Sequence, residues 1–239
     1  MRKLLVLLLA IPIIGFSQTK TVVNVTRLFA KPEKVAELEK ALAAHAQKYH
    51  TGNWKWRVFS INTGPDAFGY NIVEGPNSWT DLDTRGDLGA EHTADLTKNI
   101  APLTMSQGSE SYMVYRDDLS SVQPTDYTDK ISVTHVFPKV GWGVKIENYL
   151  KKAKKVWEKS GESIAVYQSH FSGQAQYLVV TRHKQGWKEK EKDFRKPFVE
   201  RYNEVNGENA YDDYLGSIQT YVDHAWGEML TLRADLSSK

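Results

Sequence analysis

The stretch Val23-Asn-Val-Thr-Arg-Leu-Phe29 occurs twice in this chain. Its second version, Ile131-Ser-Val-Thr-His-Val-Phe137, lies 108 residues further along, and the same spacing carries Trp79 onto Trp187. Apolar and polar residues largely alternate in both versions, a pattern typical of a half-buried β-strand. Matches in the same order at constant spacing indicate an internal duplication.

A second matching pair marks the ends of the two copies. Tyr115-Arg-Asp-Asp-Leu-Ser-Ser121 corresponds to Leu232-Arg-Ala-Asp-Leu-Ser-Ser238 at a spacing of 117. The second copy has therefore gained residues before its last strand. We divide the chain into a first repeat at 18–121, a polar linker at 122–130 and a second repeat at 131–239.

Both copies show the order strand, helix, strand, strand, helix, strand. The first copy predicts strands at 23–29, 54–61, 68–73 and 111–116, with helices at 35–49 and within 78–103. The second predicts strands at 131–137, 164–171, 175–181 and 228–232, with helices at 144–159 and 187–205.

This element order is that of a ferredoxin-like βαββαβ unit, which has one antiparallel sheet with both helices on one face. The other face must also be covered, and packing of the two sheets on each other achieves this. The expected fold is α+β, with two such repeats packed as a pseudo-dimeric barrel. It resembles the dimeric α+β barrel superfamily, in a tandem form compatible with either a monomer or a dimer. That superfamily includes antibiotic-biosynthesis-type monooxygenases, heme-degrading enzymes and chlorite-dismutase-like proteins, so the resemblance constrains fold more than chemistry.

The first 17 residues predict a Sec signal peptide. Arg2 and Lys3 precede an apolar run from Leu4 to Ile14, and Gly15-Phe-Ser17 supplies small residues before a cut at Gln18. The run is shorter than the roughly 20 residues of a membrane-spanning helix. We therefore expect a periplasmic or secreted protein that is not membrane-bound after cleavage; an uncleaved anchor is the alternative.

The composition limits the classes of partner that the protein is expected to bind. The chain has 239 residues, of which 41% are hydrophobic and 25% charged, as in ordinary globular proteins. Loss of the two leader cations reduces the 31 basic residues to 29, which equals the 29 acidic residues. A neutral mature chain gives no electrostatic reason to expect nucleic-acid binding. The absence of cysteine excludes disulfides, thiolate metal sites and cysteine nucleophiles.

Two polar residues interrupt the apolar faces of the duplicated strands. Arg27 has the strand parity of Val23 and Val25, and His135 is its counterpart in the second copy. Burying such residues without a partner is costly. We predict that they line a pocket for a small ligand; a hydrogen-bonded position at the strand edge is the alternative.

Two further histidines are candidate ligand-binding residues. His45 shares the apolar face of the first helix, and His170 ends a predicted strand that could approach His135. No carboxylate accompanies them at a recognised ligand spacing, so we predict no metal site. We also expect no cofactor, with heme as an alternative through His135 or His45.

Trp54 and Trp56 complete the candidate ligand-binding set. They lie two residues apart in a predicted strand, where their rings could stack on an aromatic or sugar ligand. Packing in the protein core is the alternative.

The common catalytic signatures are missing from the sequence. It contains no P-loop, GxGxxG, GxSxG or HExxH motif. We therefore favour a role in binding a small ligand or a partner protein. The alternative is a cofactor-independent monooxygenase-like or heme-handling enzyme, so the sequence leaves open whether the protein is an enzyme.

Overall fold

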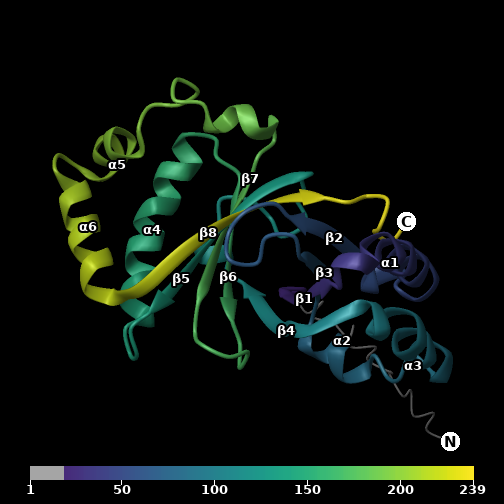
Figure 1. Ribbon diagram of the computed structural model, residues 1–239. Helices are drawn as coiled ribbons and strands as arrows, with labels where there is room; N and C mark the ends of the chain where they lie inside the picture. The colour runs from purple at the N-terminus through teal and green to yellow at the C-terminus, as the bar shows by residue number, and fades with distance from the viewer. Residues whose placement is uncertain (1–18) are drawn as a thin grey trace, which may run out of the picture.

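Eight antiparallel strands form a closed barrel at the centre of the molecule (Figure 1). The computed structural model describes residues 19–239, so the predicted signal peptide lies outside the described residues. The strands are β1 (Val22–Ala30), β2 (Trp56–Ile61), β3 (Tyr70–Asn77), β4 (Thr104–Tyr115), β5 (Lys130–Pro138), β6 (Ile164–Ser169), β7 (Tyr177–Arg182) and β8 (Val222–Leu232).

The strand order explains how one chain closes the barrel. Around the barrel it is β1-β3-β2-β8-β5-β7-β6-β4. The first four strands are thus adjacent in the order β4-β1-β3-β2, and the last four repeat this order as β8-β5-β7-β6. Two antiparallel seams join the halves: β2 pairs with β8, and β4 pairs with β6. The mixed α+β fold and the barrel are as expected from the sequence.

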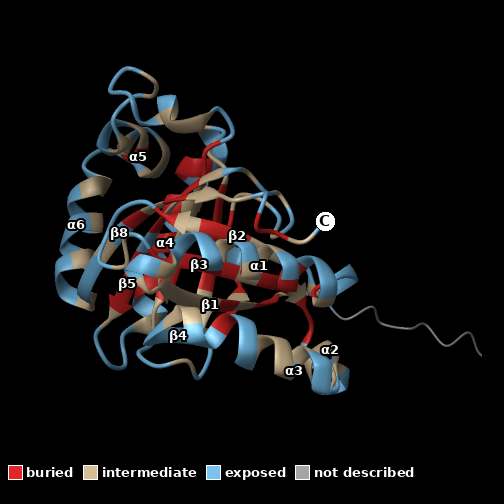
Figure 2. Ribbon diagram, turned by 45° about the vertical axis from the view of Figure 1, so that its right-hand side comes forward, coloured by how far each residue is buried: buried red, intermediate tan, exposed pale blue. Residues whose placement is uncertain are grey.

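Helices cover the outside of the barrel in two separate groups (Figure 1). Beside the first four strands lie α1 (Val35–Tyr49), α2 (Trp79–Thr84) and α3 (Ala90–Asp95). Beside the last four lie α4 (Gly143–Lys159), α5 (Phe198–Asn206) and α6 (Ala210–Tyr221). Figure 2 shows the buried residues concentrated in the strands and the exposed residues on the outer sides of the helices. Within residues 19–239, no helix is both long and apolar enough to cross a membrane.

The second helical region of the second copy differs from its prediction. The expected helix at 187–205 is a 3-10 turn, Gly186–Lys190, followed after an irregular segment by α5. Gly207, at a φ of 111°, ends α5, and α6 follows before β8 begins. The aromatic side chains of α5 and α6 pack together over α4, including Tyr202, which is fully buried. Tertiary packing, not local periodicity, therefore set these boundaries.

Two equivalent segments hold the halves together by docking onto each other's half. In the first, Arg116 donates to both oxygens of Glu147 on α4, at 2.6 and 2.9 Å. In the second, Arg233 donates to both oxygens of Glu39 on α1, at 2.5 and 3.1 Å. The motif Arg-x-Asp-Leu-Ser-Ser occurs in both segments, so this repeated stretch of sequence corresponds to a repeated contact.

The leucine and serines of each segment add to this docking. Leu119 is fully buried against the α4 side, and Leu236, 3% exposed, packs with the α1 side. The hydroxyl of Ser120 accepts from Val166 N of β6, and that of Ser237 accepts from Val58 N of β2. Each half therefore supplies part of the other half's core.

Candidate functional site

The inside of the barrel contains a cavity of about 270 Å³. Its middle is apolar, and its ends are polar. The apolar lining comes from inward-facing residues of several strands, among them Val23, Val25, Phe59, Met113, Val133, Leu178 and Val180. Alternation along a strand places every second residue inside, which is why the parity of Arg27 and His135 also directs them into the cavity.

A buried ionic network occupies one end of the cavity. Arg27 on β1 forms an ion pair with both oxygens of Glu228 on β8; its Nη1 lies 3.0 Å from Oε2. Arg27 Nη1 also donates to Asp66 Oδ2 at 2.6 Å, from the loop between β2 and β3. The Glu228 side chain is fully buried. A buried carboxylate needs such partners, because desolvation without them costs several kcal/mol per ion.

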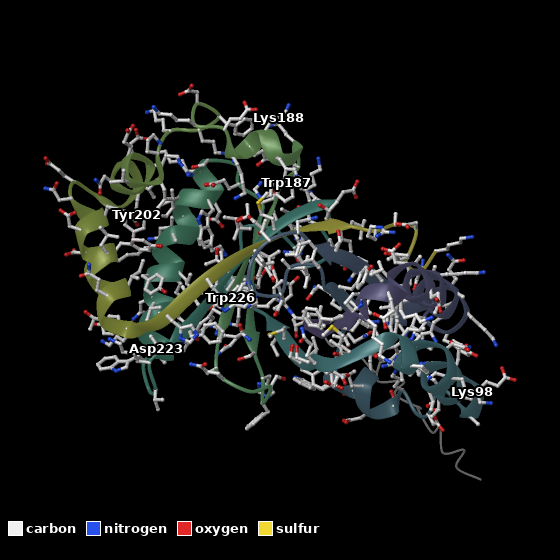
Figure 3. The ribbon with its side chains drawn as sticks, in the orientation of Figure 1. Lys98, Trp187, Lys188, Tyr202, Asp223 and Trp226 are labelled. Carbon is white, nitrogen blue, oxygen red and sulfur yellow. The ribbon has the colours of Figure 1, made fainter. Side chains whose placement is uncertain are left out.

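His135 joins this network from β5, which belongs to the same half of the barrel as Glu228 and to the opposite half from Arg27. Its Nε2 lies 3.0 Å from Glu228 Oε1 and 3.5 Å from Arg27 Nη2. Its Nδ1 lies 2.9 Å from Gln176 Oε1, and its ring stacks on Trp226 with centroids 3.7 Å apart. In Figure 3, Trp226 lies near the middle of the molecule, on β8 between the two groups of helices.

The network sets the charges at this end of the cavity. Burial acts to raise the pKa of Glu228, but hydrogen bonds from His135 and Arg27 outweigh it, and the pKa is lowered. Burial acts to lower the pKa of Arg27, but its bonds to Glu228 and Asp66 outweigh this effect, and its pKa is raised. Glu228 is therefore an anion and Arg27 a cation at neutral pH. Because a carboxylate only accepts hydrogen bonds, Nε2 of His135 carries a proton toward it.

Two arginines line the cavity away from this network. Among residues 19–239, neither Arg57 nor Arg182 pairs with a carboxylate: Arg57 donates to Gly75 O at 2.5 Å, and Arg182 donates to backbone oxygens of 123–126. Arg57 also stacks on Tyr127 at 3.9 Å, and Arg182 donates to the Tyr167 hydroxyl at 3.1 Å. Burial lowers the pKa of Arg57, although an arginine stays charged at any ordinary pH. This part of the cavity can therefore accept an anionic or oxygen-rich group.

The structure separates the other predicted ligand-binding residues from the cavity. His45 lies on the outer side of the barrel, where Asp95, His50 and Trp56 surround it. His170 is exposed after β6 and packs against Trp79, so it does not approach His135. Of the predicted set, Arg27 and His135 alone line the barrel cavity.

The two predicted tryptophans do not form a shared strand face. Trp54 lies in a 3-10 turn, Gly52–Trp54, before β2 begins, and its ring lies under the Arg85 guanidinium at 4.4 Å. Trp56 stacks on His50 with centroids 3.7 Å apart. Both rings pack against other side chains on the helix-covered outside of the barrel.

Sequence reasoning missed the anion of the network and both of the other cavity arginines. A signal for Glu228 was present: it has the parity of Leu230 and Leu232 in the predicted last strand. That strand was predicted to begin only at 228, whereas β8 begins at Val222, so Trp226 and Glu228 were not recognised as inward-facing neighbours. Arg57 carried a similar signal, because it shares the parity of Phe59 and Ile61 in the predicted strand 54–61. Arg182 follows the predicted strand 175–181 by one residue and was therefore not considered.

The histidines named as heme ligands do not fit that group. An axial histidine needs a nitrogen free to face the iron. Both ring nitrogens of His135 face Gln176 and Glu228, and those of His45 face Asp95 and His50. The cavity of about 270 Å³ is also slightly smaller than ordinary ligand pockets, which start at about 300 Å³, whereas a porphyrin is a large ligand.

Comparison with known proteins identifies the class of fold. No family model and no curated protein matches the sequence. Solved structures match over almost the whole chain: a candidate monooxygenase from Lactobacillus acidophilus NCFM has a TM-score of 0.54 at 11% identity, covering 92% of this chain and 96% of that one. An anthrone oxidase-like protein has a TM-score of 0.56 at 15% identity, covering 90% and 92%. A mutant chlorite dismutase from Candidatus Nitrospira defluvii has a TM-score of 0.52 at 6% identity, covering 92% and 93%.

These similarities place the protein in the dimeric α+β barrel class of folds. They also correct the functional expectation from the sequence. A role in binding alone was favoured because catalytic motifs were missing, but the similar structures carry the names of monooxygenases, an oxidase-like protein and chlorite dismutases. The enzymatic alternative is the better supported one. Motif searches miss such sites because their polar residues come from strands far apart in sequence.

Proposed function

We propose that the protein is a monooxygenase-like enzyme that oxidises a small aromatic or enolisable compound inside the barrel. The observation that carries this proposal is the Arg27–Glu228–His135 network at one end of an otherwise apolar cavity. Apolar walls suit an aromatic ring system, and a small number of convergent polar groups is typical of an enzyme pocket. The names of the similar structures agree with oxidation chemistry.

His135 is the residue best placed to move a proton. Glu228 accepts from its Nε2 and so fixes the orientation of the ring, as a carboxylate does for a catalytic histidine. Trp226 holds the ring from one face. Nδ1, next to Gln176, is then the nitrogen that can take a proton from an acidic C–H or O–H group once the Gln176 amide presents its N–H or gives way to the substrate.

Two of the three arginines that line the cavity would stabilise the anion formed. Arg27 lies beside His135, and Arg57 lies farther along the cavity without a carboxylate partner among the described residues. An electron-rich substrate anion can pass electrons to O2 without a resident cofactor. For an activated CH2 group, the balanced reaction with O2 gives C=O and one water, with one oxygen atom in each product.

Oxygen consumption tests this proposal directly. Purified protein is mixed with anthrone-type and hydroquinone-type compounds, and O2 uptake is measured with product identification by mass spectrometry. We expect the H135A substitution to lower the rate by about 10²- to 10⁴-fold, the usual contribution of a general base. The control H224A changes an exposed histidine paired with Asp223 and should keep the wild-type rate.

A second variant distinguishes chemistry in the cavity from chemistry at the surface. V25F places a larger side chain in the apolar lining and should abolish turnover while the circular dichroism spectrum is retained. Failure of the wild-type protein to consume O2 with any compound of either class, or full activity of H135A, would contradict the proposal.

We further propose that the halves 18–121 and 131–239 arose by duplication and that residues 1–17 direct export. The shared strand order and the reciprocal docking segments support duplication. Expression of the full chain in a bacterial host, fractionation and mass spectrometry test export: we expect periplasmic or secreted protein that begins at Gln18. An intact chain that stays in the cytoplasm would contradict it.

A further inference from the structure

Three histidines meet on the outside of the barrel, away from the cavity described above. His45 belongs to α1, His50 follows this helix, and His92 belongs to α3. One ring nitrogen from each lies within 4.8 Å of the other two. His45 and His50 are almost fully buried, at 1% and 2% exposure, and His92 is half-buried.

Two carboxylates fix which nitrogens of the buried pair carry protons. Asp95 Oδ2 lies 2.7 Å from Nδ1 of His45, and Glu74 Oε2 lies 2.9 Å from Nδ1 of His50. A carboxylate accepts hydrogen bonds, so each Nδ1 donates and each neutral ring keeps its lone pair on Nε2. Metal-binding histidines are commonly oriented in this way by carboxylates.

The two Nε2 atoms then face each other as hydrogen-bond acceptors, and neither carries a proton to donate to the other. They lie 3.3 Å apart, and two acceptors at this distance are satisfied only by a proton or a cation between them. Burial of both rings disfavours an imidazolium ion. The third histidine has the same need: Nε2 of His92 is buried and has no hydrogen-bond partner among residues 19–239.

The spacing suits a tetrahedral metal ion. Zinc–imidazole bonds of about 2.0–2.1 Å at a tetrahedral angle place neighbouring nitrogens about 3.4 Å apart. The His45–His50 pair already has this separation. The ring nitrogen of His92 lies within 4.8 Å of those of His45 and His50. It would have to move closer by at most about 1.4 Å to reach the separation in a zinc site, and it belongs to the short helix α3.

The surrounding charges also favour a divalent cation. Glu74 and Asp95 each pair with one of the histidines, and Arg85 is the one lysine or arginine within 19–239 that pairs with Glu74. The three neutral imidazoles together with Glu74, Asp95 and Arg85 carry one net negative charge, and the carboxylates of Asp87 and Glu110 line the adjoining cavity. Trp56 donates to Glu74 at 3.0 Å and stacks on His50, which rigidifies the second carboxylate–histidine pair.

A cavity of about 400 Å³ adjoins the histidines and is lined in part by His50, His92, Arg85 and Glu110. A metal held by three protein ligands would therefore keep a fourth position open to this cavity. Three ligands with an open position is the arrangement of catalytic rather than structural zinc sites.

We propose that His45, His50 and His92 bind one divalent transition-metal ion of the zinc class, with Asp95 and Glu74 orienting two of the ligands. Imidazole ligands also suit cobalt, nickel and copper, and neutral nitrogen donors do not favour magnesium or calcium. The site is separate from the barrel cavity and does not depend on the function proposed for it.

Metal titration of the tag-free protein tests this site. After treatment with a chelator and dialysis, the full mature chain is titrated with Co²⁺ while its visible absorption is recorded, and Zn²⁺ is then added in competition. We expect one equivalent of Co²⁺ to give the intense bands of a low-symmetry, four-coordinate site and Zn²⁺ to displace it. Zn²⁺ should also raise Tm, since a ligand that binds the folded state stabilises it.

Variants locate the ion. H92A removes the half-buried ligand and should weaken Zn²⁺ binding at least tenfold, with circular dichroism confirming that the chain folds. D95N keeps all three ligands and should weaken binding about 10- to 100-fold, as expected for an orienting carboxylate. H224A is the matched control and should bind as the wild type does. Absence of binding at one equivalent, or unchanged affinity in H92A, would overturn the proposal.

Discussion

Arg27 and His135 occupy corresponding positions in the two halves of the sequence, and the structure places Nη2 of one 3.5 Å from Nε2 of the other. They meet because β1 and β5 belong to opposite halves of one closed barrel, and both side chains point into its interior. Glu228 lies between them and bonds to both. The two corresponding inward positions therefore hold a cation and an imidazole that share one carboxylate.

Removal of the Arg27 cation should destabilise the fold. R27M leaves Glu228 fully buried with His135 as its remaining hydrogen-bond partner, and we expect a loss of about 3 kcal/mol in the free energy of unfolding. Urea denaturation measures this change. The double variant R27M/E228Q, which removes the buried anion as well, should be more stable than R27M; equal or lower stability would show that the charge is not the cause.

Acid should weaken the fold through three buried or half-buried glutamates. The pKa of Glu39 is lowered by Arg233, that of Glu147 by Arg116, and that of Glu228 by His135 and Arg27 against the effect of burial. An unfolded glutamate has a pKa of about 4.3, so near this pH the unfolded chain binds more protons than the folded one. The stability that these glutamates contribute above about pH 4.3 should therefore be lost as the pH falls through their lower pKa values in the folded protein.

Urea denaturation between pH 6 and pH 3 measures that dependence. E147Q removes one of the three groups and should flatten the slope below pH about 4.3. E200Q, at an exposed glutamate of α5, is the control and should leave the slope unchanged. A slope that is identical in E147Q and wild type would refute the assigned cause.

The reciprocal docking segments should contribute similarly to stability. Leu119 and Leu236 are equivalent and are 0% and 3% exposed. L119A and L236A should each cost about 2–5 kcal/mol, the range for truncation of a buried leucine. L215A, at a 39% exposed position on α6, should cost less than about 0.5 kcal/mol. Thermal unfolding of the three variants provides the comparison, and a loss confined to one docking segment would show that the halves are not equivalent.

The arginines in the cavity should bind an aromatic anion. We expect anthraquinone-2-sulfonate to bind in the barrel and R57M to weaken this binding about tenfold, because Arg57 has no carboxylate partner among the described residues. Fluorescence titration measures the affinity. R201M is the control, since Arg201 pairs with Glu162 outside the cavity; an equal effect of both changes would indicate binding elsewhere.

Much of the fold could be predicted from local patterns. Alternation in 23–29 and 131–137 identified β1 and β5 and their inward faces, and the helical spacing of 35–49 matched α1. The predictions failed where tertiary packing determines the local structure. Trp54 lies in a turn despite its aromatic surroundings, and α6 forms over α4 although its local pattern did not predict a helix.

The candidate sites were less predictable than the fold. His45 was recognised as an unusual residue on an apolar face, but nothing in the sequence connected it with His92, 47 residues away. The same holds for Arg27 and Glu228, which are 201 residues apart. Ligand spacings are informative only when the ligands lie on one helix or loop, and neither site is built in this way.

The sequence by itself determined the repeated strand pattern, the alternation of the first strand in each half, and the polar residues Arg27 and His135 on the inward faces of these strands. Tertiary structure alone decided that Glu228 joins these two and that three histidines converge beside α1. The physical reason is that periodicity records which face of an element is buried, whereas barrel closure and helix packing decide which buried faces meet.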